Sequence, residues 1–259
     1  MAKLQDTTIT AHDLSSYVQT SSDFAFEMRV LAHLQALGFT CRHAGTYLDP
    51  VRERARQFDI RAVQHRGDHR LSLAVECKNL RTNFPLLVSA VPRQQTEAFH
   101  QRIVFVRERL HTALQVRDSR TFYTPGDMVG KQTDQVGKSH GGEWVGNDQE
   151  TFEKVSQALN SAHDLIREST MPDPPYTRVV LPVLVIPNER LWQVEYSANG
   201  TLQRDPRPVP RTTVFVDHLF RLTADYLNTD VQYRISHLEI VTFDELQNSM
   251  AAYFKALFR

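Results

Sequence analysis

The chain has 259 residues, 41% of them hydrophobic, and its 30 basic residues balance its 30 acidic residues. A chain of this length and composition is expected to fold as a globular protein with a sizeable core. The balanced charge excludes a global positive field of the kind that marks many nucleic-acid-binding proteins. Positive charge is nevertheless concentrated locally, because residues 42–70 hold seven arginines against four carboxylates.

The sequence also indicates a cellular compartment. No apolar run approaches the ~20 residues that a membrane-spanning helix requires. We therefore expect a soluble, cytoplasmic protein that makes no contact with membranes. The two cysteines, Cys41 and Cys77, are too few for a disulfide framework or a four-ligand zinc site. Both are predicted to be buried and reduced.

In the first part of the chain, the pattern predicts one helix followed by three strands. The helix covers residues 22–37, and Gly38 follows it as the C′ residue. Its apolar residues recur at helical spacing: Phe24, Met28, Leu31 and Leu34. Three short segments that are rich in strand-forming residues and bounded by turn residues follow, at 39–43, 56–64 and 71–79.

The middle of the chain is predicted to be mostly helix and loop. Residues 94–115 mix apolar and charged residues at roughly helical spacing, although 103–106 could instead form a strand. Residues 124–149 hold six of the ten glycines and few large apolar side chains, so we expect a long mobile loop there. A further helix is predicted over 148–167, before the prolines 172, 174 and 175.

The last third of the chain is predicted to supply the centre of the sheet. Residues 179–186 are almost continuously apolar, which predicts a central strand covered on both faces. Residues 191–196 are expected to pair with that strand as a hairpin or an extension. The remaining elements are a surface connection at 203–211, strands at 212–216 and 235–241, and a helix at 242–257.

Together these elements predict an α/β fold with a central mixed β-sheet flanked by helices. We expect a single domain over residues 1–259. Its catalytic motifs lie within 22–115, and residues 116–259 complete the sheet and add loops and helices.

Chemically active residues are concentrated where two of the predicted strands meet. A Gly-Asp pair at 67–68, between two strand-like runs, suits a two-residue hairpin loop. In the register set by that loop, Asp59 lies directly opposite Glu76. Because side chains alternate along a strand, Glu76 and Lys78 share one face, opposite to the apolar face that carries Val75. The hairpin therefore presents two carboxylates and an amine within reach of each other.

Two facing carboxylates need a compensating cation. Directly opposed residues have Cβ atoms roughly 4.5–5.5 Å apart, so the charges of Asp59 and Glu76 repel each other. Mg²⁺ prefers oxygen ligands and typically uses one or two carboxylates, together with water and phosphate oxygens. Such an ion stabilises charge on a phosphate and activates water, while the ammonium of Lys78 can orient that water or neutralise the transition state. The pair predicts a Mg²⁺ site in which Mn²⁺ can substitute.

Glu27 is a second acidic residue in an unusual place. It lies three residues after Phe24 and four before Leu31, on the apolar stripe of the first helix. A carboxylate there is costly unless a cation or hydrogen bonds meet it. Two explanations are open at this point, a metal-binding role and a structural salt bridge to an arginine among residues 52–61.

The order of these features resembles a known group. A helix with an acidic residue, three strands, Asp59 on the second strand, and Glu76 and Lys78 in a Glu-x-Lys sequence on the third resemble the PD-(D/E)xK nuclease superfamily. Its fold is called restriction-endonuclease-like and has an αβββαβ core. The likeness covers residues 22–115. Phe58 stands where the family name has proline, a position at which the family is permissive.

The resemblance implies a role for each matching residue. Asp59 and Glu76 would bind Mg²⁺, and the carbonyl oxygen of Cys77 would be a further ligand. Lys78 would assist the attacking water. Glu27 would support a second metal ion or its water.

Basic residues elsewhere are candidates for contacts with phosphates, which dominate nucleic-acid affinity. They are Arg52, Arg54 and Arg56 before the second strand, and Lys131, Lys138 and His140 on the glycine-rich segment. An ordinary charged loop explains the arginines equally well, and a plain surface loop explains the lysines and His140 better. Gln94 and Gln95 match a place where some relatives carry a polar active-site residue.

The resemblance implies a Mg²⁺-dependent DNA endonuclease that hydrolyses backbone phosphodiesters, in restriction or antiphage defence. The expected partners are DNA and either a second copy of the chain or a protein of a defence complex. Two alternatives stay open, a catalytically silent nuclease-fold subunit for nucleic-acid binding or assembly, and an RNA-cleaving nuclease. The carboxylate pair argues against the silent subunit, because a pure binding module has no reason to keep two repelling charges together.

Overall fold

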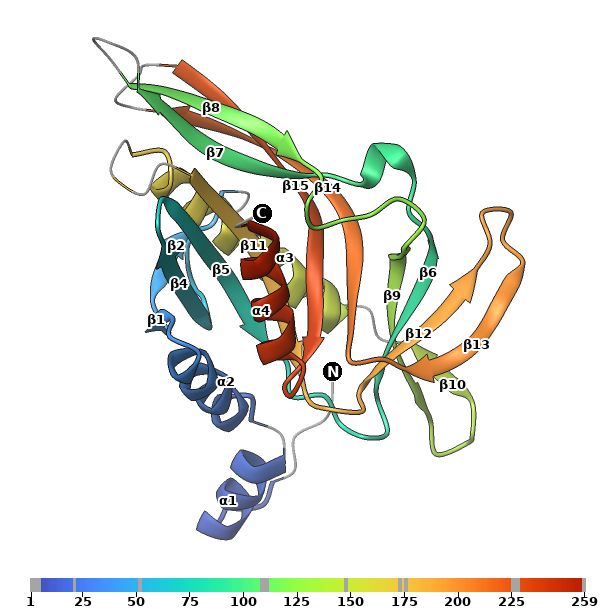
Figure 1. Cartoon of the computed structure of the whole chain (residues 1–259). Coiled ribbons are helices and arrows are strands. Elements are labelled where there is room, and N and C mark those ends of the chain that lie inside the picture. The colour runs from blue at the N-terminus through green and yellow to red at the C-terminus, as the bar shows by residue number, and fades with distance from the viewer. Residues whose placement is uncertain are drawn as a thin grey trace.

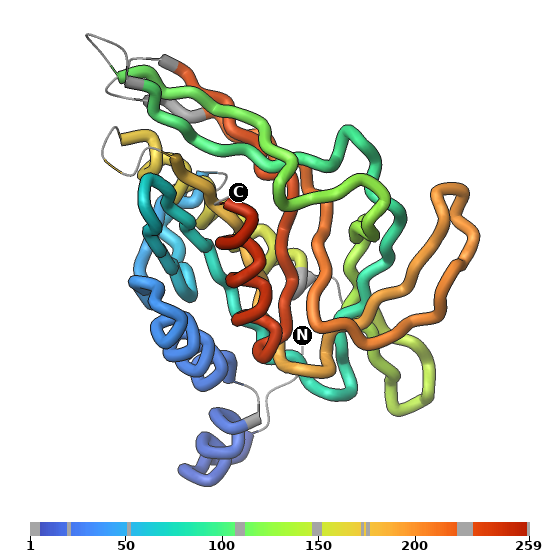
Figure 2. The backbone as a smooth tube through the Cα atoms, in the orientation of Figure 1, coloured from blue at the N-terminus to red at the C-terminus, as the bar shows by residue number. Residues whose placement is uncertain are grey.

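The computed structural model describes residues 6–20, 22–50, 53–107, 112–146, 149–171, 174, 177–224 and 229–257. It shows an α/β protein built on one large mixed β-sheet with helices packed against it (Figure 1), so the predicted class is confirmed. Figure 2 follows the backbone from the N-terminal helices to the C-terminal helix. In the described part of the chain, no helix is both long and apolar enough to cross a membrane.

The unit that carries the predicted motifs is one end of the sheet, in the order β1-β4-β5-β11. β4 is antiparallel to β1 and to β5, and β11 runs parallel to β5. One helix precedes β1 and another precedes β11. These elements are α2 (Phe24–Ala36), β1 (Thr40–His43), β4 (Ile60–Arg66), β5 (His69–Cys77), α3 (Gln149–Glu168) and β11 (Thr177–Ile186).

Beyond β11 the sheet continues through longer strands. Its order is β15, β14, β9, β6, β12 and β13, with antiparallel and parallel neighbours mixed. The bounds are β6 (Leu86–Pro92), β9 (Met128–Lys138), β12 (Leu191–Tyr196), β13 (Leu202–Pro208), β14 (Arg211–Ala224) and β15 (Thr229–Thr242).

Smaller elements complete the fold. β2 and β3 form a separate two-stranded sheet, β7 pairs with β11 and β8, and β10 pairs with β9. The bounds are α1 (Ala11–Thr20), β2 (Thr46–Leu48), β3 (Ala55–Gln57), the 3₁₀ helix η1 (Gln95–Glu97), β7 (His100–Arg107), β8 (Thr112–Ser119), β10 (Trp144–Gly146) and α4 (Leu246–Leu257).

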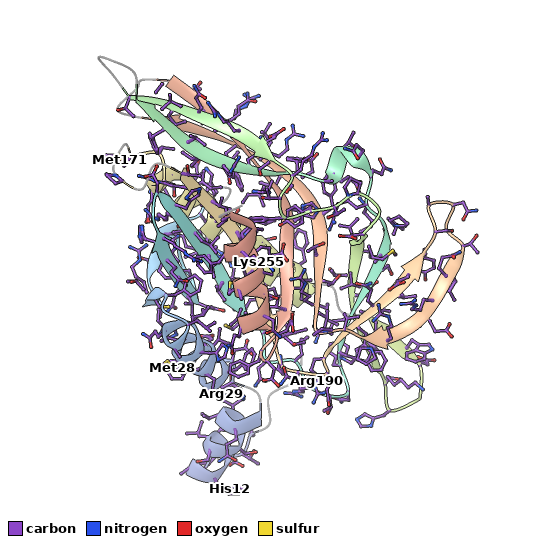
Figure 3. All side chains as sticks on the ribbon, viewed as in Figure 1. His12, Met28, Arg29, Met171, Arg190 and Lys255 are labelled. Atoms are coloured by element: carbon purple, nitrogen blue, oxygen red, sulfur yellow. The ribbon has the colours of Figure 1, made fainter. Side chains whose placement is uncertain are left out.

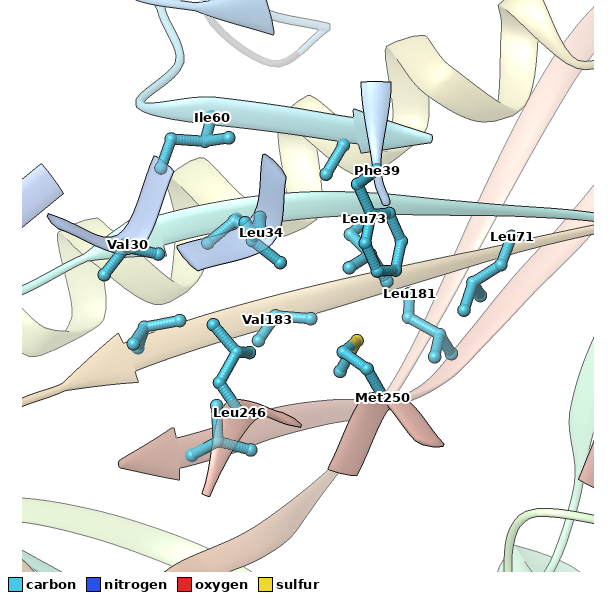
Figure 4. Packing of buried hydrophobic residues seen from close by; sticks show 14 of the residues in the cluster. Val30, Leu34, Phe39, Ile60, Leu71, Leu73, Leu181, Val183, Leu246 and Met250 are labelled. Atoms are coloured by element: carbon cyan, nitrogen blue, oxygen red, sulfur yellow. The ribbon is translucent and has the colours of Figure 1, made fainter. Parts of the chain in front are cut away.

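The two faces of the sheet pack against different helices. Leu73 of β5 and Val183 of β11 pack against α2 and α4 in the first core cluster (Figure 4). Ala74 and Val180, from the same two strands, lie in a second cluster with residues of α3. The outer surface of the helices carries polar side chains such as Lys255 on α4 and also apolar ones such as Met28 on α2 (Figure 3). Because side chains alternate along a strand, even-numbered residues of β5 point towards α3.

The β4–β5 hairpin has the predicted register. Ile60 faces Val75, which is the pairing expected for a two-residue turn at 67–68. The glycine of that turn has φ of 56°, a conformation that glycine adopts at little cost. One step beyond Ile60, this register brings Asp59 opposite Glu76.

Several other predicted elements are confirmed. The helices expected at 22–37 and 148–167 correspond to α2 and α3, and Gly38 after α2 has φ of 87°. The strand expected at 179–186 is β11, which lies between β5 and β15. The strand expected over 56–64 is instead two strands, β3 and β4, because the chain passes there from the small sheet into the large one.

The helix predicted over 94–115 is wrong. After η1, the described residues of this segment form the antiparallel strands β7 and β8, and residues 108–111 lie outside the described part. The alternative, a strand at 103–106, is confirmed as part of β7. Ile103 and Phe105 are buried while the residues between and beside them are partly exposed, which is the two-residue period of a strand. Gln94 and Gln95 therefore do not begin the long helix that was predicted. They lie at the start of η1, where the backbone N–H of Gln94 donates to the Glu97 carboxylate at 3.1 Å.

The mobile loop predicted over 124–149 is also wrong. Eleven residues of this segment form β9, which pairs with β6, β10 and β14, and three more form β10. Residues 147 and 148 lie outside the described part. Two glycines of β9 mark close packing: a Cβ on Gly130 would lie 2.5 Å from Val88 Cγ1, and one on Gly137 would lie 2.5 Å from Phe84 Cδ2. Glycine is needed here because neighbouring side chains fill the space.

In the last third, the pairing predicted for residues 191–196 is wrong, and the surface connection predicted over 203–211 is exposed as expected but contains a strand. The partners of β12 are β6 and β13, where a hairpin with β11 was expected. Residues 203–211 are mostly the edge strand β13, all of whose residues are exposed. Pro206 and Pro208 have no amide hydrogen to donate, and an edge strand tolerates this.

Candidate active site

Two carboxylates and an ammonium meet at one end of the β4–β5 hairpin. Glu76 lies near the end of β5, and Asp59 immediately precedes β4. Lys154 Nζ, from α3, donates to Asp59 Oδ2 at 2.8 Å and to Glu76 Oε2 at 3.3 Å. Both carboxylates therefore point to the side of the sheet that α3 covers.

The backbone holds the Asp59 carboxylate in place. Phe58 N donates to Gly45 O at 2.9 Å, and Ala44 N donates to Asp59 O at 3.0 Å. In addition, the backbone N–H of Cys77 donates to Asp59 Oδ2 at 2.8 Å. The carboxylate is thus fixed by the main chain of β5 as well as by its own strand connection.

Glu76 is the most deeply buried member of the site. Its exposed fraction is 0%. Burial, and then the neighbouring Asp59 carboxylate, raise the pKa of Glu76 well above its usual range, and the Lys154 ammonium opposes this rise. Glu76 Oε1 is buried and has no hydrogen-bond partner among the described residues. A buried acceptor without a partner is costly, so a cation at this oxygen would be favoured.

Lys154 was not among the residues predicted from the sequence. Burial by itself lowers the pKa of its ammonium, but Glu76 and Asp59 outweigh burial and raise that pKa above its usual value. Lys154 lies four residues before Ala158, which packs against the sheet, so it belongs to the buried stripe of α3. A charge on a buried stripe requires a partner. This is the argument that singled out Glu27, and it could have identified Lys154.

Glu27 of α2 lies beside the pair. Its Oε2 is 3.3 Å from His43 Nε2 of β1. Burial, and then the charge of Asp59, raise the pKa of Glu27, whereas its hydrogen bond with His43 lowers it. In the described ranges, the side chain that meets Glu27 is this histidine, where an arginine was one expectation. Glu27 is therefore a third carboxylate that is electrostatically coupled to Asp59.

Lys78 is directed to a neighbouring cavity. Its backbone N–H donates to Val185 O at 3.0 Å, and its Nζ lies 3.9 Å from Asp23 Oδ2 before the start of α2. The residue lines a cavity of about 480 Å³. The structure thus brings together the three predicted carboxylates, while Lys154 occupies the position beside them that was expected for the amine of Lys78.

The two cysteines are free thiols. Cys77 is buried, as predicted, and its side chain packs on the α2 side of the sheet, whereas Cys41 is only partly buried. Burial raises the pKa of both thiols, that of Cys41 to about 11, so they are expected to be unreactive. The carbonyl group of Cys77 belongs to the residue directly after Glu76.

The two predicted phosphate-binding arginines that the structure describes, Arg54 and Arg56, have different surroundings. Arg56 of β3 pairs with the buried carboxylate of Asp49 at 3.4 Å, which favours a structural role. Arg54 is exposed, and Arg52 lies outside the described residues. Arg61 is buried and ion-paired to α3, so it belongs to the core.

Lys131 and Lys138 share β9 but have different surroundings. Lys131 Nζ bonds to the Glu97 carboxylate. Lys138 lines the cavity of about 480 Å³ beside the carboxylates, and its Nζ lies 4.6 Å from the centre of the Trp144 ring. His140 is exposed in the turn after β9.

The residues of the site fit a hard divalent cation. Asp59 and Glu76 offer carboxylate oxygens, and Glu76 Oε1 is without a partner in the described structure. No group of three or more His, Cys, Asp or Glu side chains in the described ranges is placed to hold a metal ion. Mg²⁺ requires only one or two protein carboxylates, because water and phosphate oxygens complete its shell. An entering cation would compete with the Lys154 ammonium for the same oxygens.

No known protein family, curated protein sequence or solved structure matches this chain at a significant level. The class that fold and site define is an α/β protein with a coupled, buried carboxylate pair at the end of a strand hairpin.

Proposed function

We propose that this protein is a Mg²⁺-dependent nuclease of the PD-(D/E)xK type that hydrolyses phosphodiester bonds in DNA. The observation that carries the proposal is the convergence of Asp59 and Glu76 on one cationic group, at 2.8 and 3.3 Å. Two carboxylates that share one ammonium are close enough to share one divalent ion. The proposal includes a cytoplasmic role in restriction or antiphage defence, as a homodimer or with a partner protein.

The order of elements supports the proposal. Along the chain, α2, β1, β4, β5, α3 and β11 form a helix, three antiparallel strands, a helix and a strand parallel to the third. This is the αβββαβ order that the resemblance implies. The small sheet of β2 and β3 is inserted between the first two of these strands. Residues 78–148 form an insertion between the third strand and the second helix, and the described part of that insertion carries β6 to β10.

The three carboxylates have two tasks in the proposed reaction, metal binding and support of the attacking water. Mg²⁺, when bound, stabilises negative charge on the phosphate and activates water. Asp59 and Glu76 would hold the ion, with the carbonyl of Cys77 as a further ligand. The pKa of Glu27 is raised by burial and by Asp59, so Glu27 accepts a proton more readily than an exposed carboxylate and would support the attacking water.

Two ammonium groups divide the task that the motif assigns to Lys78. Lys154 neutralises the carboxylate pair. Its charge also limits the rise in the pKa of Glu76 that burial and Asp59 cause, which favours the charged form that binds cations. Lys78 lines the adjoining cavity and would contact the substrate phosphate, where a fixed positive charge stabilises the transition state.

Incubation of the purified protein with plasmid DNA, linear DNA and single-stranded RNA, with Mg²⁺, Mn²⁺ or EDTA, tests the proposal. The wild type is expected to cleave DNA only when metal is present. Asp59→Asn and Glu76→Gln keep the shape of each side chain and remove its charge. Each is expected to lower the rate by roughly 10²-fold or more, as does loss of one electrostatic group at a reacting centre.

Asp68→Asn is the matched control. It removes a carboxylate from the exposed turn at the other end of the same hairpin and should leave the rate unchanged. If Asp59→Asn and Lys78→Ala both cleave DNA at the wild-type rate, the assignment of these residues to the active site is wrong. If the wild type cleaves neither DNA nor RNA with any metal, the silent binding subunit is favoured, and cleavage of RNA alone would favour the RNA-cleaving alternative.

A further inference from the structure

Two adjoining cavities lie beyond the end of β5. The first, of about 480 Å³, is lined by three basic residues, Lys78, Arg81 and Lys138, against one carboxylate, that of Asp23. The second, of about 430 Å³, has a mainly apolar lining. Asn83 and Lys138 line both cavities, so the basic cavity opens directly beside the apolar one.

Both tryptophans of the chain line the apolar cavity. Trp144 of β10 lies directly opposite Lys138 of β9, and 73% of its surface is exposed. Trp192 lies on β12, beside β6. The Lys138 ammonium is 4.6 Å from the centre of the Trp144 ring. Exposed aromatic rings next to cations are the groups that bind unstacked bases and their phosphates.

The basic cavity adjoins the proposed catalytic site through Lys78, the one residue of that site in its lining. Lys78 is two residues after Glu76, and the Asp23 carboxylate, which lines the same cavity, accepts a hydrogen bond from Asn79 N at 2.9 Å. From there the lining continues along residues 79–84 to β9 and β10. A strand with its reacting phosphate at the carboxylates would therefore place a neighbouring phosphate in the basic cavity.

The apolar cavity suits a base that is not paired. Bases inside a duplex are stacked and present only their edges in the grooves. A cavity lined by two indoles binds the flat face of a base, which is accessible only in a single strand or at an unpaired position. The neighbouring positive charge complements a nucleotide phosphate.

On the basis of the proposed nuclease function, we propose that the two cavities together bind an unpaired nucleotide next to the reacting phosphate. Its phosphate lies in the basic cavity and its base lies against Trp144 and Trp192. The substrate class is therefore nucleic acid with a single-stranded segment or an unpaired nucleotide.

Binding without cleavage tests this proposal. The full chain in EDTA is mixed with a short single-stranded oligodeoxynucleotide, the matching oligoribonucleotide and a fully paired duplex. Because both tryptophans line the apolar cavity, intrinsic tryptophan fluorescence reports on that cavity alone. Single strands are expected to change this fluorescence and to bind more tightly than the duplex, and the two oligonucleotides show whether the sugar matters.

Substitution of Trp144 measures the contribution of stacking. Trp144→Ala is expected to weaken single-strand binding roughly 5- to 150-fold in fluorescence anisotropy, the change expected for loss of one stacked base. Trp144→Phe keeps an aromatic ring and should retain most of the affinity. Leu219→Ala, on β14 and lining a different cavity, is the control and should bind like the wild type. Melting temperatures verify that all variants fold.

The proposal is overturned if single strands bind without a fluorescence change, if they do not bind, or if Trp144→Ala and Leu219→Ala bind alike. The outcome is separable from that of the cleavage assay. If single strands bind as expected but the protein shows no metal-dependent cleavage, the nucleotide site is supported and the nuclease function is excluded. Cleavage with unaffected Trp144 variants would support the nuclease and remove this site.

Discussion

Replacing Lys154 with methionine tests whether its ammonium stabilises the carboxylate pair. The side chains of Lys154, Asp59 and Glu76 are 16%, 12% and 0% exposed, so little water screens their charges. Loss of one partner from a buried ion pair costs ~3–5 kcal/mol, because the other charge is left uncompensated. Methionine is an unbranched apolar side chain, which limits any additional loss of packing. We expect the free energy of unfolding to fall by about 3–5 kcal/mol near neutral pH in EDTA.

The loss has a defined dependence on pH. Burial and Asp59 already raise the pKa of Glu76, and removal of the ammonium that opposes them raises it further. The folded variant then holds a proton that the unfolded chain has released. This contribution to stability is present below the unfolded pKa and is lost as pH rises through the folded pKa, by at most ~1.4 kcal/mol per pH unit. The variant should therefore be closest to the wild type in mild acid.

Urea unfolding followed by circular dichroism, in mild acid and near neutral pH, measures both effects. Lys131→Met is the matched control, because Lys131 pairs with Glu97 but its side chain is 35% exposed, and we expect a loss of about 1 kcal/mol or less. If Lys154→Met loses no more than this control near neutral pH, the reasoning is refuted. Mg²⁺ should stabilise Lys154→Met more than the wild type, since no ammonium competes for the carboxylates.

Two further predictions concern the core. Burial lowers the pKa of His100 to about 3, so the folded histidine stays neutral while the unfolded one takes up a proton. This stabilisation is present above about pH 6.5 and is lost as pH falls. Between about pH 6.5 and about pH 5, the free energy of unfolding of His100→Phe should therefore fall by ~2 kcal/mol less than that of the wild type, as measured by urea unfolding. An equal fall in both proteins would contradict a buried, neutral His100. Gly137→Ala places a Cβ 2.5 Å from the Phe84 ring and should cost about 1–3 kcal/mol, whereas Gly146→Ala meets nothing within 4 Å. Similar melting temperatures for the two alanine variants would count against the packing explanation.

Local patterns were enough to predict the elements that place the carboxylates. A two-residue turn sets the register of its own hairpin, so the Gly-Asp pair at 67–68 determines that Asp59 faces Glu76. α3 is strongly periodic, and β11 is almost continuously apolar. In α2 the predicted apolar stripe is only half buried, because Leu31 and Leu34 lie in the core whereas Phe24 and Met28 are exposed. Each of these signals lies within a single segment of the chain.

Segments whose structure depends on distant partners were predicted wrongly. The glycines of β9 suggested a loop. Gly130 and Gly137 are instead positions where a larger residue would not fit, because Val88 and Phe84 pack against them. β12 was expected beside β11, yet its neighbour is β6, from a much earlier part of the chain. A single sequence contains no direct record of such contacts.

The sequence by itself determined that two acidic residues face each other on a hairpin with an apolar reverse side. Only the tertiary structure decided which cation meets them, because Lys154 is 95 residues from Asp59 along the chain. It also decided that Lys138 and Trp192, from different strands, line one cavity. Strand alternation and turn geometry are encoded within a few residues, whereas the docking of a helix or strand depends on apolar surfaces that distant segments create together.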